Sequence, residues 1–322
     1  MSIIQSNVTP SAKATDFLGR KHKMLIGSEW VDAGSGETLE VLNPATGAEI
    51  ARIPNGVAAD VDLAVTAARK AFDNSDWSRM RPAQREKLLW RLADLMEQNI
   101  EELAELESID NGKSVIVAQH VDITVAIDFL RYMAGWATKV EGRSVQASVS
   151  YMPDAVLHGY TRREPIGVVG AIIAWNFPLL LAAWKLGPAL ATGCTFVIKP
   201  AQETSLSVLR LGELIQEAGY PDGVVNIVTG EGAVAGDALA KHPGVDKLTF
   251  TGSTEVGKLI GKAAMDNMTR LTLELGGKSP VIVLPDADLA KTAAGVAMGI
   301  FFNSGQVCSA GSRLYVHKKI FD

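Results

Sequence analysis

Residues 166–199 read IGVVGAIIAWNFPLLLAAWKLGPALATGCTFVIK. An apolar run at 166–173 precedes a helical pattern at 178–192, and a second apolar run covers 195–198. Short apolar runs are typical of strands that are buried on both faces of a parallel sheet, and a helix between two of them is typical of a βαβ unit. The stretch therefore predicts a strand, a helix and a second, parallel strand.

The same alternation continues to residue 274. We expect further helices at 205–218, 233–241 and 254–266 and further strands at 224–228, 247–250 and 270–274. Short apolar strands that alternate with amphipathic helices predict the α/β class, with a doubly wound parallel sheet of Rossmann type covered on both faces. Because ligands of such sheets bind at the carboxyl ends of the strands, the loops after Ile173, Ile198, Val228, Phe250 and Glu274 are the candidate site.

The residues before 166 predict a different pattern. We expect short antiparallel strands at Met24–Ile26, Glu29–Val31 and Leu39–Leu42, and helices at Asp60–Phe72, Pro82–Ile109 and Val121–Thr138. Residues 1–20 are expected to be a loose arm. The polar, turn-rich stretch Ser144–Arg163 predicts a protruding hairpin.

The composition limits the classes of function. The 322 residues are 47% hydrophobic and 21% charged, which excludes general disorder, and the net charge of −5 disfavours a nucleic-acid partner. The most apolar stretch, 166–198, is interrupted by Asn176, Lys185 and prolines, so we expect no membrane span. No secretory signal is visible in the first twenty residues.

Cysteine and histidine usage points to a cytoplasmic protein without a metal. Two cysteines, Cys194 and Cys308, are too few for a disulfide framework and fit a reducing compartment. The five histidines are scattered, and no Cys/His spacing is typical of a metal site.

Each polar side chain in the candidate loops has two interpretations. Asn176 precedes a helix, so it is either an N-cap or a donor to a developing oxyanion. Lys199 is either solvated or reaches a ribose or phosphate. Glu274 is either an exposed edge charge or a tuned base. The turn at 251–257 is either an ordinary helix cap or a pyrophosphate site.

The two cysteines have contrasting surroundings. Cys308 stands among small polar residues and glycines, which is unusual for a buried, inert cysteine. Cys194 opens an apolar strand, where packing is the expected role.

Five motifs follow one another at the expected strand ends. They are Trp-Asn-Phe-Pro (175–178), Ile-Lys-Pro-Ala (198–201), Phe-Thr-Gly-Ser-Thr-Glu-Val-Gly (250–257), Leu-Glu-Leu-Gly-Gly-Lys (273–278) and Phe-Phe-Asn-Ser-Gly-Gln-Val-Cys (301–308). In this order they resemble the non-acylating, NAD(P)-dependent aldehyde dehydrogenase superfamily over residues 20–322. The resemblance implies a cofactor-binding domain at 1–141 and 164–274, an oligomerisation hairpin at 142–163, and the start of an α/β catalytic domain at 275–322.

The resemblance also implies a mechanism. Cys308 would attack the aldehyde carbon, while the Asn176 side chain and the Cys308 N–H would hold the oxyanion. Glu274 would activate the water that hydrolyses the thioester, so the product would be a free carboxylic acid. The implied partners are a small aldehyde and, for the complete protein, further copies in a dimer or tetramer.

Cofactor and substrate positions follow from the same motifs. The cofactor positions are Ile172, Trp175, Lys199, Gln202, Gly252 and Ser253. Many NAD-preferring members carry Glu where this chain has Gln202, and Gln lacks the charge that repels a 2′-phosphate, so NAD is expected first and NADP second. The implied substrate pocket, formed by Phe177, Leu181, Trp184 and Val307, favours aromatic or apolar aldehydes.

The family pattern continues beyond residue 322. We therefore expect a truncated chain whose nicotinamide site is incomplete and whose aldehyde oxidation is poor or absent. The alternative function is a catalytically impaired relative with a binding or structural role. A different dinucleotide oxidoreductase is disfavoured, because the usual glycine fingerprint is missing.

Overall fold

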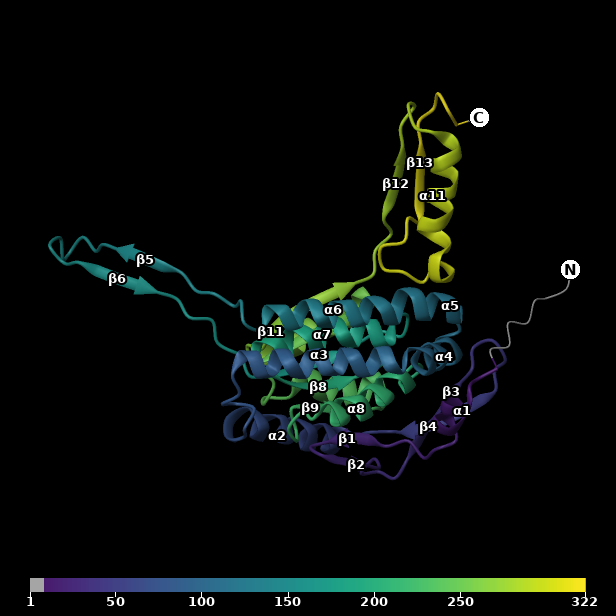
Figure 1. The fold of residues 1–322 in the computed structure, drawn as a ribbon. Coiled ribbons are helices and arrows are strands. Elements are labelled where there is room, and N and C mark those ends of the chain that lie inside the picture. The colour runs from purple at the N-terminus through teal and green to yellow at the C-terminus, as the bar shows by residue number, and fades with distance from the viewer. Residues whose placement is uncertain (1–8, 322) are drawn as a thin grey trace, which may run out of the picture.

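The five strands predicted between residues 166 and 274 form the parallel centre of the largest sheet (Figure 1). The computed structural model describes residues 9–321. The parallel strands are β7 (Val168–Ile172), β8 (Thr195–Lys199), β9 (Val225–Ile227), β10 (Lys247–Gly252) and β11 (Arg270–Leu275). In the order β11-β10-β7-β8-β9-β1-β2, the sheet continues into β1 (Met24–Ile26) and β2 (Glu29–Val31), which pair antiparallel at one edge.

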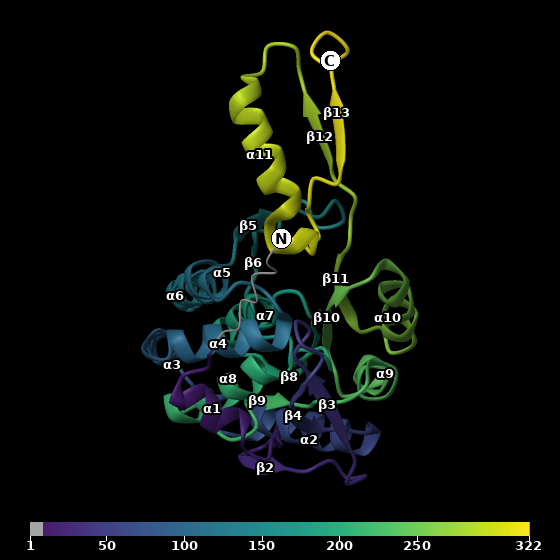
Figure 2. The ribbon, with the colours of Figure 1, turned by 90° about the vertical axis from the view of Figure 1, so that its right-hand side faces the viewer.

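Helices cover both faces of this sheet, as the doubly wound prediction requires. One face carries α7 (Pro178–Thr192) and α8 (Leu206–Ala218), and the other carries α2 (Ala58–Asn74), η2 (Gly232–Gly236), α9 (Asp237–Lys241) and α10 (Thr254–Asp266). A further layer outside α7 and α8 comprises α3 (Pro82–Gln98), α4 (Ile100–Asn111), α5 (Val115–Val117), η1 (Ala118–Ile123) and α6 (Thr124–Trp136). Figure 2 shows the two sets of helices on opposite sides of the strands. Each face has its own buried apolar cluster, so the strands are apolar on both sides.

Two helix predictions before residue 140 are wrong at their boundaries. The stretch expected to be one helix, Pro82–Ile109, is two helices that meet at Asn99. The Asn99 side chain donates to the Leu95 carbonyl at 2.8 Å, which is the local competition that makes Asn a poor residue inside a helix. The helix expected from Val121 begins earlier, with the π-helical turn η1, and continues as α6.

The loose-arm prediction is wrong for the part that the structure describes. Residues 1–8 lie outside the described residues, but α1 (Ala12–Leu18) is a helix with Ser11 as its N-cap. Phe17 is buried in the larger apolar cluster, so packing holds this short helix in place. The sequence analysis also missed β4 (Glu49–Pro54), which pairs antiparallel with β3 (Thr38–Leu42).

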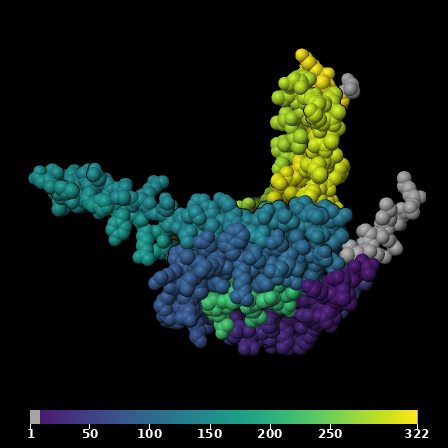
Figure 3. Space-filling model, viewed as in Figure 1, coloured from purple at the N-terminus to yellow at the C-terminus, as the bar shows by residue number. Residues whose placement is uncertain are grey.

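Two parts of the chain project from the body of the molecule (Figure 3). One is the predicted hairpin, in which β5 (Ser144–Ala147) pairs antiparallel with β6 (Leu157–Tyr160). The other is a small unit in which α11 (Leu289–Phe301) lies beside the parallel pair β12 (Pro280–Val283) and β13 (Arg313–Val316), with the short η3 (Phe302–Gly305) after α11. No residue of α11 is buried.

Two features are absent from residues 9–321. No helix in this range is long and apolar enough to cross a membrane. Over the same residues, no group of three or more His, Cys, Asp or Glu side chains has the arrangement of a metal site.

One carboxylate joins the beginnings of two central strands to α2. Asp246, just before β10, accepts a hydrogen bond from the Val168 N–H at 2.7 Å and pairs with the Arg69 guanidinium of α2. Gly167 has φ of +128°, and a Cβ there would lie 1.8 Å from Asp246 Oδ2. Only glycine therefore allows the carboxylate to approach the strand.

We expect Gly167→Ala to lower the free energy of unfolding by about 1–3 kcal/mol from backbone strain, with a further loss from displacing Asp246. Chemical denaturation followed by circular dichroism measures this change. The control is Gly261→Ala in α10, where the nearest atom to a new Cβ is 3.8 Å away. That substitution should stabilise the protein by about 0.5–1 kcal/mol. Equal stability of the Gly167→Ala variant and the native chain would contradict the packing argument.

Candidate active site

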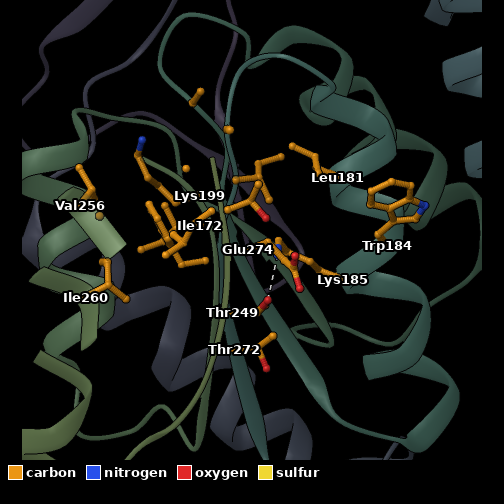
Figure 4. A pocket seen from close by; sticks show the side chains of 18 of the residues that line it. Ile172, Leu181, Trp184, Lys185, Lys199, Thr249, Val256, Ile260, Thr272 and Glu274 are labelled. Atoms are coloured by element: carbon orange, nitrogen blue, oxygen red, sulfur yellow. Dashed lines mark hydrogen bonds between the residues drawn. The ribbon is translucent and has the colours of Figure 1, made fainter. Parts of the chain in front are cut away.

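A cavity of about 1550 Å³ opens at the carboxyl ends of β7, β8, β10 and β11 and extends along α7. Figure 4 shows side chains from these elements converging on it. Twelve of the thirteen predicted site residues line it: Ile172, Trp175, Asn176, Leu181, Trp184, Lys199, Gln202, Gly252, Ser253, Glu274, Val307 and Cys308. The cavity is thus lined by a thiol and an amide donor from two loops and by a carboxylate from the end of β11.

Asn176 does not cap the helix that follows it, so the N-cap interpretation is wrong. The N-cap of α7 is Phe177, and neither Phe177 nor Asn176 makes a side-chain capping hydrogen bond at this end. The Asn176 amide instead donates from Nδ2 to the Gln306 carbonyl at 2.8 Å, in the segment that carries Cys308. Because an amide nitrogen has two hydrogens, one remains available for a ligand in the cavity.

The segment before Cys308 has an unusual backbone. Asn303 and Ser304 have φ of +48° and +57°, and Gly305 has φ of +78°. Left-handed backbone at residues other than glycine costs free energy and persists only where other contacts hold it. Here Asn303 Nδ2 donates to the Asn176 carbonyl at 3.3 Å. This hydrogen bond joins the cysteine segment (residues 302–308) to the loop between β7 and α7, the Asn176 loop (residues 173–177).

The two cysteines differ as the sequence predicts. Both residues line the cavity, but Cys308 is exposed, whereas Cys194, just before β8, is buried and only 3% accessible. An accessible thiol at the edge of a cavity is available for chemistry, and a buried one in an apolar cluster is not.

Lys199 is not the solvated lysine that its position at a strand end predicts on its own. The side chain ends β8 and is only 3% exposed, and burial lowers its pKa to about 8. Gln202 lies nearby, and its Oε1 accepts a long hydrogen bond from the Gly232 N–H at 3.4 Å. Both side chains therefore present polar atoms to the cavity from the loop after β8.

Gly252 ends β10, and Ser253 is the N-cap of α10. Ser253 Oγ accepts from the Val256 N–H at 3.2 Å, which confirms the ordinary helix-cap interpretation of this turn. A Cβ at Gly252 would lie 2.4 Å from the Phe250 ring, so the position requires glycine for packing as well. The turn nevertheless directs the positive end of a helix of thirteen residues toward the cavity.

Lys185 is a site residue that the sequence analysis missed. It projects from α7, and its Nζ donates to Thr249 Oγ1 at 2.9 Å (Figure 4). Burial lowers its pKa to about 8, and the nearby Glu274 carboxylate opposes that shift. The one available signal was a lysine within an apolar helix, which marks a polar contact on the buried side.

The predicted substrate pocket is reproduced only in part. Leu181, Trp184 and Val307 line the cavity, but Phe177 does not. The Phe177 ring stacks on Phe302, with centroids 6.4 Å apart and an interplanar angle of 18°. The Phe177 ring therefore packs against the cysteine segment and is not part of the cavity lining.

Comparison with known proteins identifies the group to which this architecture belongs. The model of the Aldehyde dehydrogenase family matches residues 30–322, which is most of the chain. The chain belongs to the aldehyde dehydrogenase family. A solved aldehyde dehydrogenase from Bacillus cereus, in complex with NAD+, superposes with a TM-score of 0.92 at 48% identity, over 96% of this chain and 62% of that one.

Two relatives show how far the similarity extends. The phenylacetaldehyde dehydrogenase of Pseudomonas fluorescens is 53% identical over 97% of this chain and 62% of its own length. Human retinal dehydrogenase 2 is 49% identical over 93% of this chain and 57% of its own length. The chain thus spans about 60% of the length of these aldehyde dehydrogenases.

We expect one fast-reacting thiol in this chain. Iodoacetamide should alkylate the exposed Cys308 in the native protein, while Cys194 should react only after denaturation. Mass spectrometry of peptides after timed labelling measures both rates. Cys308→Ser should abolish the fast phase, and the matched variant Cys194→Ser should leave it unchanged. Fast labelling of native Cys194 would show that the arrangement of β8 is wrong.

Proposed function

We propose that this aldehyde dehydrogenase oxidises an aldehyde to a carboxylic acid, with NAD+ as hydride acceptor and Cys308 as nucleophile. The supporting observation is the single cavity that holds the Cys308 thiol, the Asn176 amide and the Glu274 carboxylate. These groups supply the nucleophile, the oxyanion donor and the base that the reaction needs.

The first half of the reaction uses the thiol and the amide. The Cys308 thiolate attacks the aldehyde carbon, a C–S bond forms, and the carbonyl electrons move to oxygen to give a thiohemiacetal anion. The free hydrogen of Asn176 Nδ2 stabilises that oxyanion, together with the Cys308 N–H. Loss of hydride from the same carbon restores the C=O bond and leaves a thioester on Cys308.

The second half uses the carboxylate. Glu274 takes a proton from water as the water attacks the thioester carbon, and the C–S bond breaks to release the acid and the thiolate. Glu274 is exposed to the cavity, so water can reach it.

The residues present fit a dinucleotide. Lys199 offers a buried ammonium for ribose hydroxyls, and Gly252 with Ser253 offers a helix N-terminus for pyrophosphate. When bound, NAD+ would supply the hydride acceptor. The Bacillus cereus relative was solved with NAD+, which supports this choice. The neutral amide at Gln202 leaves NADP+ as the second candidate.

The cavity favours an apolar aldehyde. Trp184 and Leu181 line one wall from α7, and Val307 lies next to the nucleophile. The relatives described above are named for phenylacetaldehyde and retinal, both of which are apolar aldehydes. An apolar wall binds such substrates by burying their hydrocarbon surface, and it would leave a carboxylate of a semialdehyde without a partner.

The domain division and the assembly belong to the same proposal. Residues 1–141 and 164–274 form the cofactor domain, and residues 275–322 begin the catalytic domain. Residues 142–163 form a hairpin for contact between copies, supported by the exposure of Tyr151 and Val156, which are 80% and 99% accessible. The cytoplasmic location stays a prediction.

Two substitutions test the division of labour. In an active, complete form of the protein, Cys308→Ala should give no NADH with an aldehyde and NAD+, because no other group forms the thioester. Glu274→Gln should retain a burst of about one NADH per site and then turn over roughly 100- to 10,000-fold more slowly, because only hydrolysis is impaired. Stopped-flow absorbance measures both phases, and Cys194→Ala serves as the control. Turnover by Cys308→Ala would refute the proposal, and native protein that produces no NADH would favour a binding role.

Substrate preference has a separate test. We expect kcat/KM for phenylacetaldehyde to exceed that for succinate semialdehyde by at least about tenfold, and Trp184→Ala to reduce the ratio. Steady-state NADH production with each aldehyde measures it. A preference for the charged semialdehyde would contradict the apolar pocket.

A further inference from the structure

A cluster of buried charges lies beneath the Asn176 loop and outside the cavity. The Lys113 side chain is 1% exposed, and the side chains of Glu107 and Asp122 are fully buried. Burying three ionisable groups costs free energy unless they are paired with one another and hydrogen-bonded. The mechanism above uses none of them, so their role needs a separate explanation.

The Lys113 ammonium connects this cluster to the loop. Its Nζ pairs with the Asp122 carboxylate, lies 3.8 Å from Glu107 Oε1, and donates to the Asn176 carbonyl at 2.8 Å. The same nitrogen lies 4.3 Å from the centre of the Phe177 ring. One buried cation thus contacts the backbone of the proposed oxyanion donor and the face of the next side chain.

Two further hydrogen bonds hold the backbone on either side of Asn176. Asn111 Nδ2 donates to the Trp175 carbonyl at 2.7 Å, and Glu107 Oε2 accepts from the Leu179 N–H at 3.3 Å. All of these groups come from the last turns of α4 and the residues directly after it. The loop is therefore held at three backbone positions by one short segment of chain.

The local structure of this segment explains how it faces the loop. Gly112 ends α4 in the left-handed conformation, with φ of +85°, and a Cβ there would lie 2.7 Å from Pro44 Cγ. Ser108 Oγ then donates to the Lys113 carbonyl at 2.6 Å. The turn directs Asn111 and Lys113 to the same side, toward the loop.

From these contacts we propose that Lys113 is a positioning residue for the Asn176 oxyanion donor. The inference rests on the proposed function, because it assigns Lys113 to the Asn176 role given there. The Asn176 carbonyl accepts two hydrogen bonds, one from Lys113 Nζ and one from Asn303 Nδ2 of the cysteine segment. With its backbone fixed from both sides, the amide keeps one hydrogen on Gln306 and the other directed at the cavity.

The native chain offers a matched control. Arg210 of α8 pairs with Glu102 of α4, with Nε 2.9 Å from Oε1 and side chains 14% and 6% exposed. Its other partner in the described chain is Glu213, so this buried ion pair also involves α4 but is directed away from the Asn176 loop. Arg210→Met should lower stability without affecting the loop, whereas Lys113→Met should affect both.

Hydrogen exchange measured by mass spectrometry tests positioning without requiring activity. In Lys113→Met, peptides that cover 174–181 and 303–308 should exchange roughly tenfold to a hundredfold faster, while Arg210→Met leaves them unchanged. If Lys113→Met does not fold, Lys113→Met with Asp122→Leu replaces the pair by apolar groups, and Arg210→Met with Glu102→Leu is its control. Unchanged exchange in the folded Lys113 variant would overturn the proposal.

A double-mutant cycle, measured by the rate of the NADH burst, tests whether Lys113 acts through Asn176. Lys113→Met should slow the NADH burst by about tenfold to a hundredfold with little change in the KM for NAD+, and Lys113→Arg should recover part of the rate. In the Asn176→Ala background the same change should have almost no further effect on the burst. Additive effects would overturn the proposal. If the native chain makes no NADH but Lys113→Met still exchanges faster than the native chain, the result would support the positioning of the loop while refuting the proposed function.

Discussion

The parallel pairing of β7 with β8 on one side and β10 on the other is the constraint on which the site depends. Ile172 pairs with Lys199 and with Phe250, so three strands end at nearly the same level. Parallel strands place their carboxyl ends at one edge of a sheet, and the loops that follow must open there. The Asn176 loop, Lys199 and the start of α10 are neighbours for this reason, although dozens of residues separate them in the chain.

The apolar runs predict most of the sheet because its central strands are largely apolar and buried on both faces. The runs at 168–172 and 195–199 are buried along their whole length, which leaves no other place for them than the middle of the sheet. The prediction is wrong where a single contact decides the outcome. The break at Asn99 depends on one side-chain hydrogen bond, and the order of α1 depends on where Phe17 packs. Neither contact leaves a periodic trace in the sequence.

The residues of the candidate site are likewise predictable from the sequence only in part. Motif order indicates that Glu274 and Asn176 line one cavity, because motifs at strand ends meet at one edge. The expected strand end is wrong for the Cys308 motif, which follows α11 and η3 and reaches the cavity from the small unit outside the main sheet. Lys113 and Lys185 have no comparable signal, since their partners lie on elements distant in sequence. Burial also reverses the expectation for Lys199, because only the packed structure shows that its stem and ammonium lie inside. Long-range packing, which one sequence does not display, accounts for these differences.

The hydrogen bonds from Asn111 and Lys113 to the loop have a consequence for how the protein can vary. Both reach main-chain carbonyls, those of Trp175 and Asn176, and every amino acid carries that group. The support of the loop is therefore indifferent to which side chain stands at Trp175. Natural drift or directed evolution can exchange that side chain for another while the carbonyl anchors persist. The fold thereby separates two requirements: the anchors act on the backbone path, and the cavity alone acts on the side chain at position 175.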